Sequence, residues 1–205
     1  MRDIVFLVAD NDMEQTIKGL MSRPDDLGIR PVTYDIYRHP QRDAGCWNVA
    51  HDFLRPFHRQ YQYAMVLFDH HGSGQEKKSV EKLQDKLEER LSKNGWPDRS
   101  RVIIFQPELE IWVWSVSPIV DRVLGWAART PDLRSWLRRK KLLRSNQVKP
   151  DDPKEVMLQA LREVQKHPSS AYFKQLAEQV PVDGCEDAGF LRFRETLQRW
   201  FPPST

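Results

Sequence analysis

Carboxylate and imidazole side chains stand directly after apolar runs of this chain, where they could bind a divalent metal. The candidates at these places are Asp10, Asp69, His71, Glu108 and Glu110. Mg²⁺ and Mn²⁺ take hard oxygen ligands, usually one or two carboxylates with waters and substrate phosphate, and an imidazole suits Mn²⁺ better than Mg²⁺. The residue types therefore predict a site for Mg²⁺ or Mn²⁺. All five residues are candidate ligands, and Asp10, Asp69, His71 and Glu108 are the candidate catalytic residues.

Asp69 is the strongest of these candidates, because it ends an apolar run and opens a glycine-rich turn. In an extended segment Asp69 and His71 would face the same way. Glu108 and Glu110 stand at the expected start of a helix and would point apart, so we expect one of them to face the site. A structural alternative exists for Asp10, since an aspartate before a helix is often an N-cap.

The apolar runs that precede these residues predict β-strands alternating with helices. Strands are expected at residues 4–9, 31–37, 63–68 and 101–105. The segments between them carry apolar residues at helical spacing, most clearly at residues 75–94. Such alternation is typical of a parallel sheet with right-handed crossovers. Because ligands bind beyond the carboxyl ends of parallel strands, the ionisable side chains would gather at one functional edge.

The chain changes character after residue 116, where strand patterns give way to helical ones. Helices are expected near residues 120–128, 133–143, 153–166, 169–180 and 187–201. The sequence thus predicts an α/β domain over residues 1–116, with a sheet flanked by helices. An α-helical C-terminal extension over residues 117–205 is expected to pack on it.

Composition excludes several broad classes of protein. Of 205 residues, 40% are hydrophobic and 30% are charged, which excludes a mostly disordered chain. The apolar runs are far shorter than the ~18 residues of a membrane span, and the N-terminal run is too short for a secretory signal. Cys46 and Cys185 lie far apart without a partner motif, so no disulfide framework is indicated. We expect a cytoplasmic protein.

A basic segment lies between residues 129 and 149, where eight basic residues accompany one acid. Its candidate phosphate contacts are Arg134, Arg138, Arg139, Lys140, Lys141 and Arg144. On a helix with an apolar seam, such a face could neutralise phosphates without reading sequence, so we expect nucleic acid as a partner. A solvated helix face or an acidic protein partner is the alternative. The formal net charge of +3 permits contact with nucleic acid but does not require it.

Three patterns in the sequence resemble a known group. A strand followed by Asp10, and a strand followed by Asp69-His70-His71, resemble the Toprim-like fold of topoisomerases, primases and overcoming-lysogenization-defect nucleases. Residues 106–112, Gln-Pro-Glu-Leu-Glu-Ile-Trp, are similar to the Pro-Glu-x-Glu-x-Trp segment of small Toprim-related proteins. Those proteins occur in bacterial defence operons, including methylation-associated defence systems. Residues 149–150, 153–155 and 197–201 also look like that group.

The resemblance implies a component of a bacterial anti-phage defence system, a metal-dependent nuclease or phosphodiesterase. It makes Asp10 a ligand or general base and Asp69 the central ligand. His71 becomes a ligand or proton-transfer group, and Glu108 or Glu110 completes the shell. The family usually carries glutamate at the position of Asp10 and aspartate at the position of His71.

These two departures keep a second hypothesis open. In it the protein is a non-catalytic interaction subunit of a multiprotein defence complex, whose other proteins are its partners and which retains a Toprim-like scaffold. A nucleotide-binding regulator ranks last, because the sequence contains no phosphate-loop lysine motif and no dinucleotide fingerprint.

Overall fold

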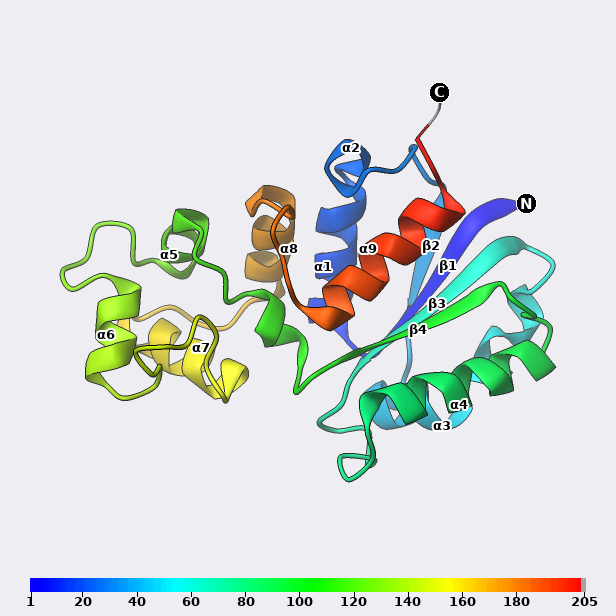
Figure 1. The fold of residues 1–205 in the computed structure, drawn as a ribbon, viewed down its shortest axis with the longest axis horizontal. Helices are drawn as coiled ribbons and strands as arrows, with labels where there is room; N and C mark the ends of the chain where they lie inside the picture. The colour runs from blue at the N-terminus through cyan, green and yellow to red at the C-terminus, as the bar shows by residue number, and fades with distance from the viewer. Residues whose placement is uncertain (204–205) are drawn as a thin grey trace.

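A parallel four-stranded sheet organises the molecule in a computed structural model, which describes residues 1–203 (Figure 1). The strands are β1 (Arg2–Val8), β2 (Tyr34–Arg38), β3 (Tyr61–Asp69) and β4 (Ser100–Phe105). Their order is β2-β1-β3-β4, and each neighbouring pair is parallel. The α/β class with a parallel, helix-flanked sheet is thereby confirmed, and it is consistent with a Rossmann-like or Toprim-like scaffold.

Helices connect these strands across both faces of the sheet. They are α1 (Asn11–Met21), α2 (Pro24–Leu27), α3 (Arg42–Leu54) with the 3₁₀ turn η1 (Arg55–Phe57), and α4 (Val80–Lys93). Helix α1 covers one face, while α3 and α4 lie together on the other (Figure 1). The chain leaves β1 toward one edge of the sheet and leaves β3 toward the opposite edge. The crevice between these two strands is therefore a topological switch point, where open α/β sheets bind ligands.

The turn between β3 and α4 is longer than the sequence pattern predicted. The ring Nε2 of His70 lies 3.0 Å from the carbonyl oxygen of Lys78, and the Ser73 hydroxyl donates to the His70 carbonyl at 2.7 Å. Because these bonds hold residues 70–79 as a turn, α4 begins at Val80 rather than at residue 75. His70 thus has a structural role in this turn.

The described chain after β4 forms helices and a 3₁₀ turn joined by loops, and residues 117–203 are called the helical part below. Its elements are the 3₁₀ turn η2 (Leu109–Trp112), α5 (Pro118–Leu124), α6 (Leu133–Arg139), α7 (Pro153–Glu163), α8 (Ser170–Gln179) and α9 (Ala188–Trp200). Helices α5, α6 and α7 gather beyond the carboxyl edge of the sheet, and α7 packs against η2 (Figure 1). Helices α8 and α9 return to the α/β part, where α8 packs against α1 and α9 packs against β4.

Close packing fixes both returning helices. A Cβ atom on Gly19 of α1 would lie 2.7 Å from Ala177 Cβ and from the carbonyl oxygen of Lys174, both on α8. Glycine is therefore what lets these helices approach so closely. On α9, the ring of Trp200 stacks on Tyr63 of β3 at 4.4 Å between centroids. Each helix within residues 1–203 is too short or too polar to cross a lipid bilayer.

Candidate metal centre

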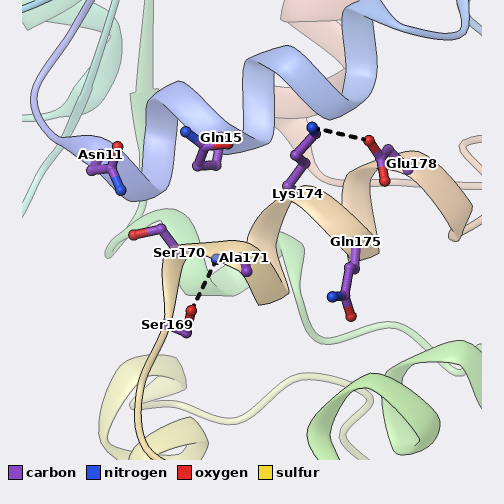
Figure 2. Close-up of a pocket in the computed structure, with 8 residues that line it drawn as sticks. All are labelled: Asn11, Gln15, Ser169, Ser170, Ala171, Lys174, Gln175 and Glu178. Atoms are coloured by element: carbon purple, nitrogen blue, oxygen red, sulfur yellow. Dashed lines mark hydrogen bonds and ion pairs between the residues drawn. The ribbon is translucent and has the colours of Figure 1, made fainter.

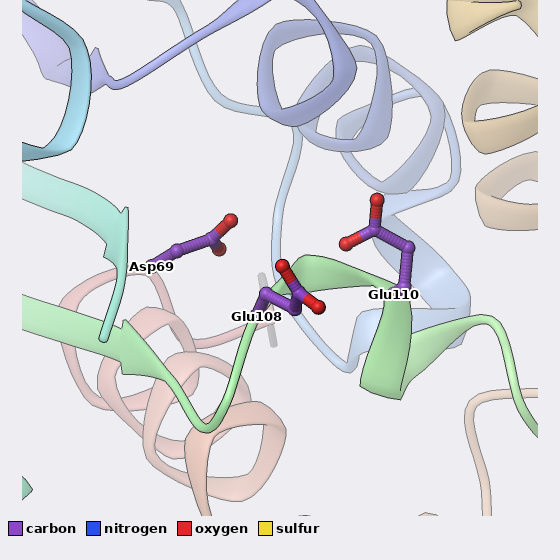
Figure 3. A group of neighbouring side chains, drawn as sticks. All are labelled: Asp69, Glu108 and Glu110. Carbon is purple, nitrogen blue, oxygen red and sulfur yellow. The ribbon is translucent and has the colours of Figure 1, made fainter. Parts of the chain in front are cut away.

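Three carboxylates meet at the carboxyl edge of the sheet. Asp69, Glu108 and Glu110 each offer an oxygen, and these oxygens all lie within 4.8 Å of one another (Figure 3). The three residues are buried, with exposed fractions of 6%, 8% and 5%. Oxygen ligands of Mg²⁺ lie about 2.0–2.1 Å from the ion, so small side-chain rotations would bring all three onto one cation.

The backbone explains why both glutamates face Asp69. The Leu109 N–H donates to Asp69 Oδ1 at 2.8 Å, and Leu109 stands between the two glutamates in the sequence. Glu108 is extended, with φ −159° and ψ 168°, and the chain then turns into the short 3₁₀ segment η2. The expectation that Glu108 and Glu110 point apart is therefore wrong. It assumed that a helix starts at Glu108, but Glu108 is extended.

Helix α9 and strand β4 hold η2 in place through Trp112. Its ring packs edge-on against Phe105 of β4 at 4.6 Å and against Phe190 of α9 at 5.1 Å between centroids. Its indole N–H donates to Asp187 Oδ1 at 2.9 Å, and Asp187 is also the N-cap of α9. The segment that carries both glutamates is thus anchored to the sheet and to the helical part.

Two further aspartates surround Asp69 at the switch point. Asp43, at the start of α3, accepts a hydrogen bond from the Asp69 N–H to its Oδ1 at 2.8 Å. Val8 of β1 pairs with Leu67 of β3, so Asp10 and Asp69 stand two residues beyond the same rung of the sheet. The sequence patterns did not predict the contact of Asp43 with Asp69.

Asp10 and His71 lie outside the group of three carboxylates. Asp10 Oδ1 accepts from the Met13 N–H at 3.0 Å, which makes Asp10 the N-cap of α1. Its charge still reaches the centre, because it contributes to the raised pKa of Asp69. His71 is exposed, and its N–H donates to the Pro107 carbonyl at 3.1 Å. Neither residue belongs to the group of three carboxylates, and Asp10 serves as the N-cap that was the structural alternative for it.

Two carboxylates of the centre, Asp69 and Glu110, have raised pKa values. Burial raises the pKa of Asp69 well above its ordinary value, and the charges of Asp43 and Glu110 raise it further. Burial also raises the pKa of Glu110 to about 7. The Oε2 atom of Glu110 is buried without a hydrogen-bond partner among the described residues. A buried acidic group in this state is complementary to a bound cation.

Lys154 is the functional candidate that the sequence reasoning missed. Its Nζ lies 3.5 Å from Glu108 Oε2 and 3.6 Å from Glu110 Oε1. Burial lowers the pKa of Lys154, but the negative charges of Glu110 and Glu108 outweigh burial and raise this pKa above its usual value. Lys154 is the second residue of α7, more than forty positions after Glu110. The only sequence signal was its place in the Pro-Lys-Glu segment noted in the resemblance.

A polar cleft lies between α1 and α8 (Figure 2). It has a volume of about 480 Å³, and Asn11, which follows Asp10 directly, lines it together with Gln15 of α1. Ser170 on the α8 side is close enough to Asp12 that its hydroxyl opposes the burial-driven rise in the pKa of Asp12. The cleft therefore extends from the acidic edge along the two helices.

The basic segment differs from the centre in its organisation. Five of its candidates are exposed, namely Arg138, Arg139, Lys140, Lys141 and Arg144. The Arg134 guanidinium instead donates to the backbone carbonyls of Val148 and Ser115. Its donors thus hold loops together, and a phosphate contact by Arg134 stays a prediction. Helix α6 lies at the far side of the helical part from the sheet (Figure 1).

Comparison of the chain with family models, curated proteins and solved structures gave no match.

Proposed function

We propose that this protein is a divalent-metal-dependent phosphodiesterase or nuclease that acts on nucleic acid. The single observation that carries this proposal is the group of buried carboxylates formed by Asp69, Glu108 and Glu110 at the switch point of the parallel sheet. As the resemblance implies, we place this activity in a bacterial anti-phage defence system in the cytoplasm.

The donor set fits Mg²⁺ or Mn²⁺ better than softer metals. Three carboxylates supply hard oxygen ligands, and the unpartnered Glu110 Oε2 provides a buried ligand atom that lacks a proton donor. A divalent ion at such a site polarises a phosphoryl oxygen and lowers the pKa of a bound water. Asp43 fixes the backbone of Asp69 by accepting a hydrogen bond from its N–H, and the Leu109 N–H fixes the Asp69 carboxylate by donating to Oδ1.

The surroundings of the centre suit a phosphodiester substrate. The polar cleft between α1 and α8 offers amide and hydroxyl groups next to the acidic edge. The exposed basic residues at the end of α6 and directly after it offer sequence-independent contacts for phosphates further along a polynucleotide. A substrate bound at the centre would thus have polar contacts on the α1 side and cationic contacts on the helical part.

A second candidate function is that of a non-catalytic subunit that binds other proteins of a defence complex. The observation that favours it is the position of Asp10 and His71, which stand at Toprim ligand positions but lie outside the carboxylate group. In this case the centre would hold a structural ion or none.

Calorimetric titration with Mn²⁺ and Mg²⁺ separates these candidates. We expect the wild type to bind the metal saturably and to cleave single-stranded DNA, duplex DNA or RNA when metal is present. Asp69→Asn should abolish both, whereas Asp85→Asn, an exposed aspartate on α4, should change neither. Binding without cleavage would favour the interaction subunit. A folded wild type that binds neither ion would contradict the proposed function.

A further inference from the structure

We propose that Lys154 occupies the place of a second cation in this centre, so that the centre takes one divalent ion. The inference rests on the proposed function, and it assigns the helical part of the chain control over how many metal ions bind. Two-metal sites in phosphoryl chemistry hold their ions about 3.5–4 Å apart between shared carboxylates. A lysine ammonium is a compact charge that can fill one of those positions.

Lys154 and a metal ion can share the two glutamates. The ammonium contacts Oε2 of Glu108 and Oε1 of Glu110 at 3.5 and 3.6 Å. The other oxygen of Glu110, Oε2, is buried without a hydrogen-bond partner among the described residues. Figure 3 shows the Glu110 carboxylate turned toward Glu108 and Asp69. One cation position is thus taken by Lys154, and a second lies between Asp69 and the glutamates.

The charge of the centre favours two cations rather than one. The carboxylates that act on one another or on Lys154 here are Asp10, Asp12, Asp43, Asp69, Glu108 and Glu110. One divalent ion leaves most of this negative charge uncompensated. Lys154 supplies a fixed positive charge beside the glutamates. Without Lys154, Glu108 Oε2 and Glu110 Oε1 would be free to bind a second ion.

The start of α7 is held firmly enough to deliver this lysine. The carbonyl oxygen of Pro153, the preceding residue, accepts a hydrogen bond from the fully buried Trp114 indole at 2.9 Å. Asp152 caps the helix by accepting from the Glu155 N–H at 3.1 Å. Because α7 belongs to the helical part, the metal centre of the sheet is completed by a residue from outside it.

The test counts Mn²⁺ ions bound per chain at pH 8 by calorimetry. We expect one ion in the wild type and two in Lys154→Met, because the variant frees one oxygen on each glutamate. Lys154→Arg keeps the charge and should bind one ion. Lys174→Met is the matched control, since Lys174 on α8 pairs with Glu178 at 3.7 Å and is 45% exposed, against 50% for Lys154 (Figure 2). It should also bind one ion.

The outcomes distinguish this inference from the proposed function. Two ions in the wild type, or one ion with unchanged affinity in Lys154→Met, would overturn the inference while leaving a metal-dependent activity in place. Binding by Lys154→Met alone would overturn both, because the inference requires one ion in the wild type. Binding by no variant would overturn both. Circular dichroism establishes that each variant is folded, and Lys154→Gln replaces Lys154→Met if the latter is not.

Discussion

The two ends of the sheet both hold buried carboxylates, but with opposite surroundings. At the amino end, Asp3 of β1 accepts hydrogen bonds from Arg30 at 2.6 Å and from the Thr33 hydroxyl at 2.7 Å and backbone N–H at 2.8 Å. Led by the Arg30 bond, these contacts lower the pKa of Asp3 to about 2. At the carboxyl end, burial raises the pKa of Glu110 to about 7, and its Oε2 has no partner in residues 1–203.

This difference teaches how to tell a structural acid from a functional one. A carboxylate that is fully supplied with donors stabilises the fold, as Asp3 does between β1 and the segment before β2. A carboxylate that is buried among other carboxylates costs stability, and such an arrangement is typical of a site that awaits a cation. Asp3 and Glu110 are both shielded from solvent, at 8% and 5% exposed, but only Asp3 has hydrogen-bond donors on both carboxylate oxygens.

The largest expected effect is that of Glu110→Gln on metal affinity. Losing one of three carboxylate ligands should weaken Mn²⁺ binding by about 100-fold or more. Without metal, the free energy of unfolding should stay within about 1 kcal/mol of the wild type. Removing a buried charge whose Oε2 has no donor among the described residues offsets the loss of the contact between Oε1 and Lys154. Calorimetry and urea unfolding measure the two quantities. Intact Mn²⁺ binding together with a large loss of stability would make Glu110 a structural acid like Asp3.

The opposite result is expected for Asp3→Asn. Its pKa shift from 3.8 to about 2 corresponds to about 2 kcal/mol of unfolding free energy at pH 7, which the variant should lose. Mn²⁺ binding should not change, because Asp3 lies at the other end of β1 from the centre. Asp85→Asn on α4 is the control and should alter neither quantity.

The pH dependence of the Asp3 contribution follows from the sign of its shift. Since the folded pKa lies below the unfolded one, the stabilisation is complete above pH 3.8 and disappears as the pH falls through about 2. The difference in unfolding free energy between wild type and Asp3→Asn should therefore shrink across this window. A difference that stayed constant from pH 7 to pH 2 would show that Asp3 acts by packing rather than by charge.

Much of the fold was predictable, because its strands are continuous apolar runs. Residues 4–9 and 101–105 predicted β1 and β4 to within two residues, and alternation with helices predicted parallel pairing. The ends of helices were less predictable where side chains intervene. The contacts of His70 delay the start of α4, and Pro56 limits α3 to residues before it, since proline cannot continue the backbone ladder.

The candidate site was predictable to the extent that strand ends define it. Asp69 and the Glu108–Glu110 pair were found because they follow strands whose carboxyl ends share an edge. The orientation of both glutamates depends on one extended residue and one backbone hydrogen bond, which spacing alone does not reveal. Lys154 comes from a helix that reaches the site only through tertiary packing, so apart from its place in residues 153–155 of the resemblance the sequence did not indicate it.

The basic segment extends the comparison to cations, with a smaller expected effect. Arg134→Gln should lower the free energy of unfolding by about 1–2 kcal/mol, because its guanidinium bonds two backbone carbonyls. Arg139→Gln, an exposed change on the same helix, should stay within about 0.5 kcal/mol. If both variants changed the free energy of urea unfolding equally, the carbonyl contacts of Arg134 would not contribute more to stability than the exposed Arg139 does.

The smallest effect concerns how Arg139 contacts nucleic acid. If the exposed basic residues bind phosphates, Arg139→Gln should weaken DNA binding a few-fold at moderate salt. Each lost phosphate contact should reduce the slope of log affinity against log salt by about 0.9 on duplex DNA. Fluorescence anisotropy at several salt concentrations measures this slope, with Arg134→Gln expected to leave it unchanged. If Arg134→Gln lowered the salt slope instead, phosphate binding would belong to Arg134, the side chain that holds the loops. The distinction between donors used for structure and donors left for a ligand would then be reversed.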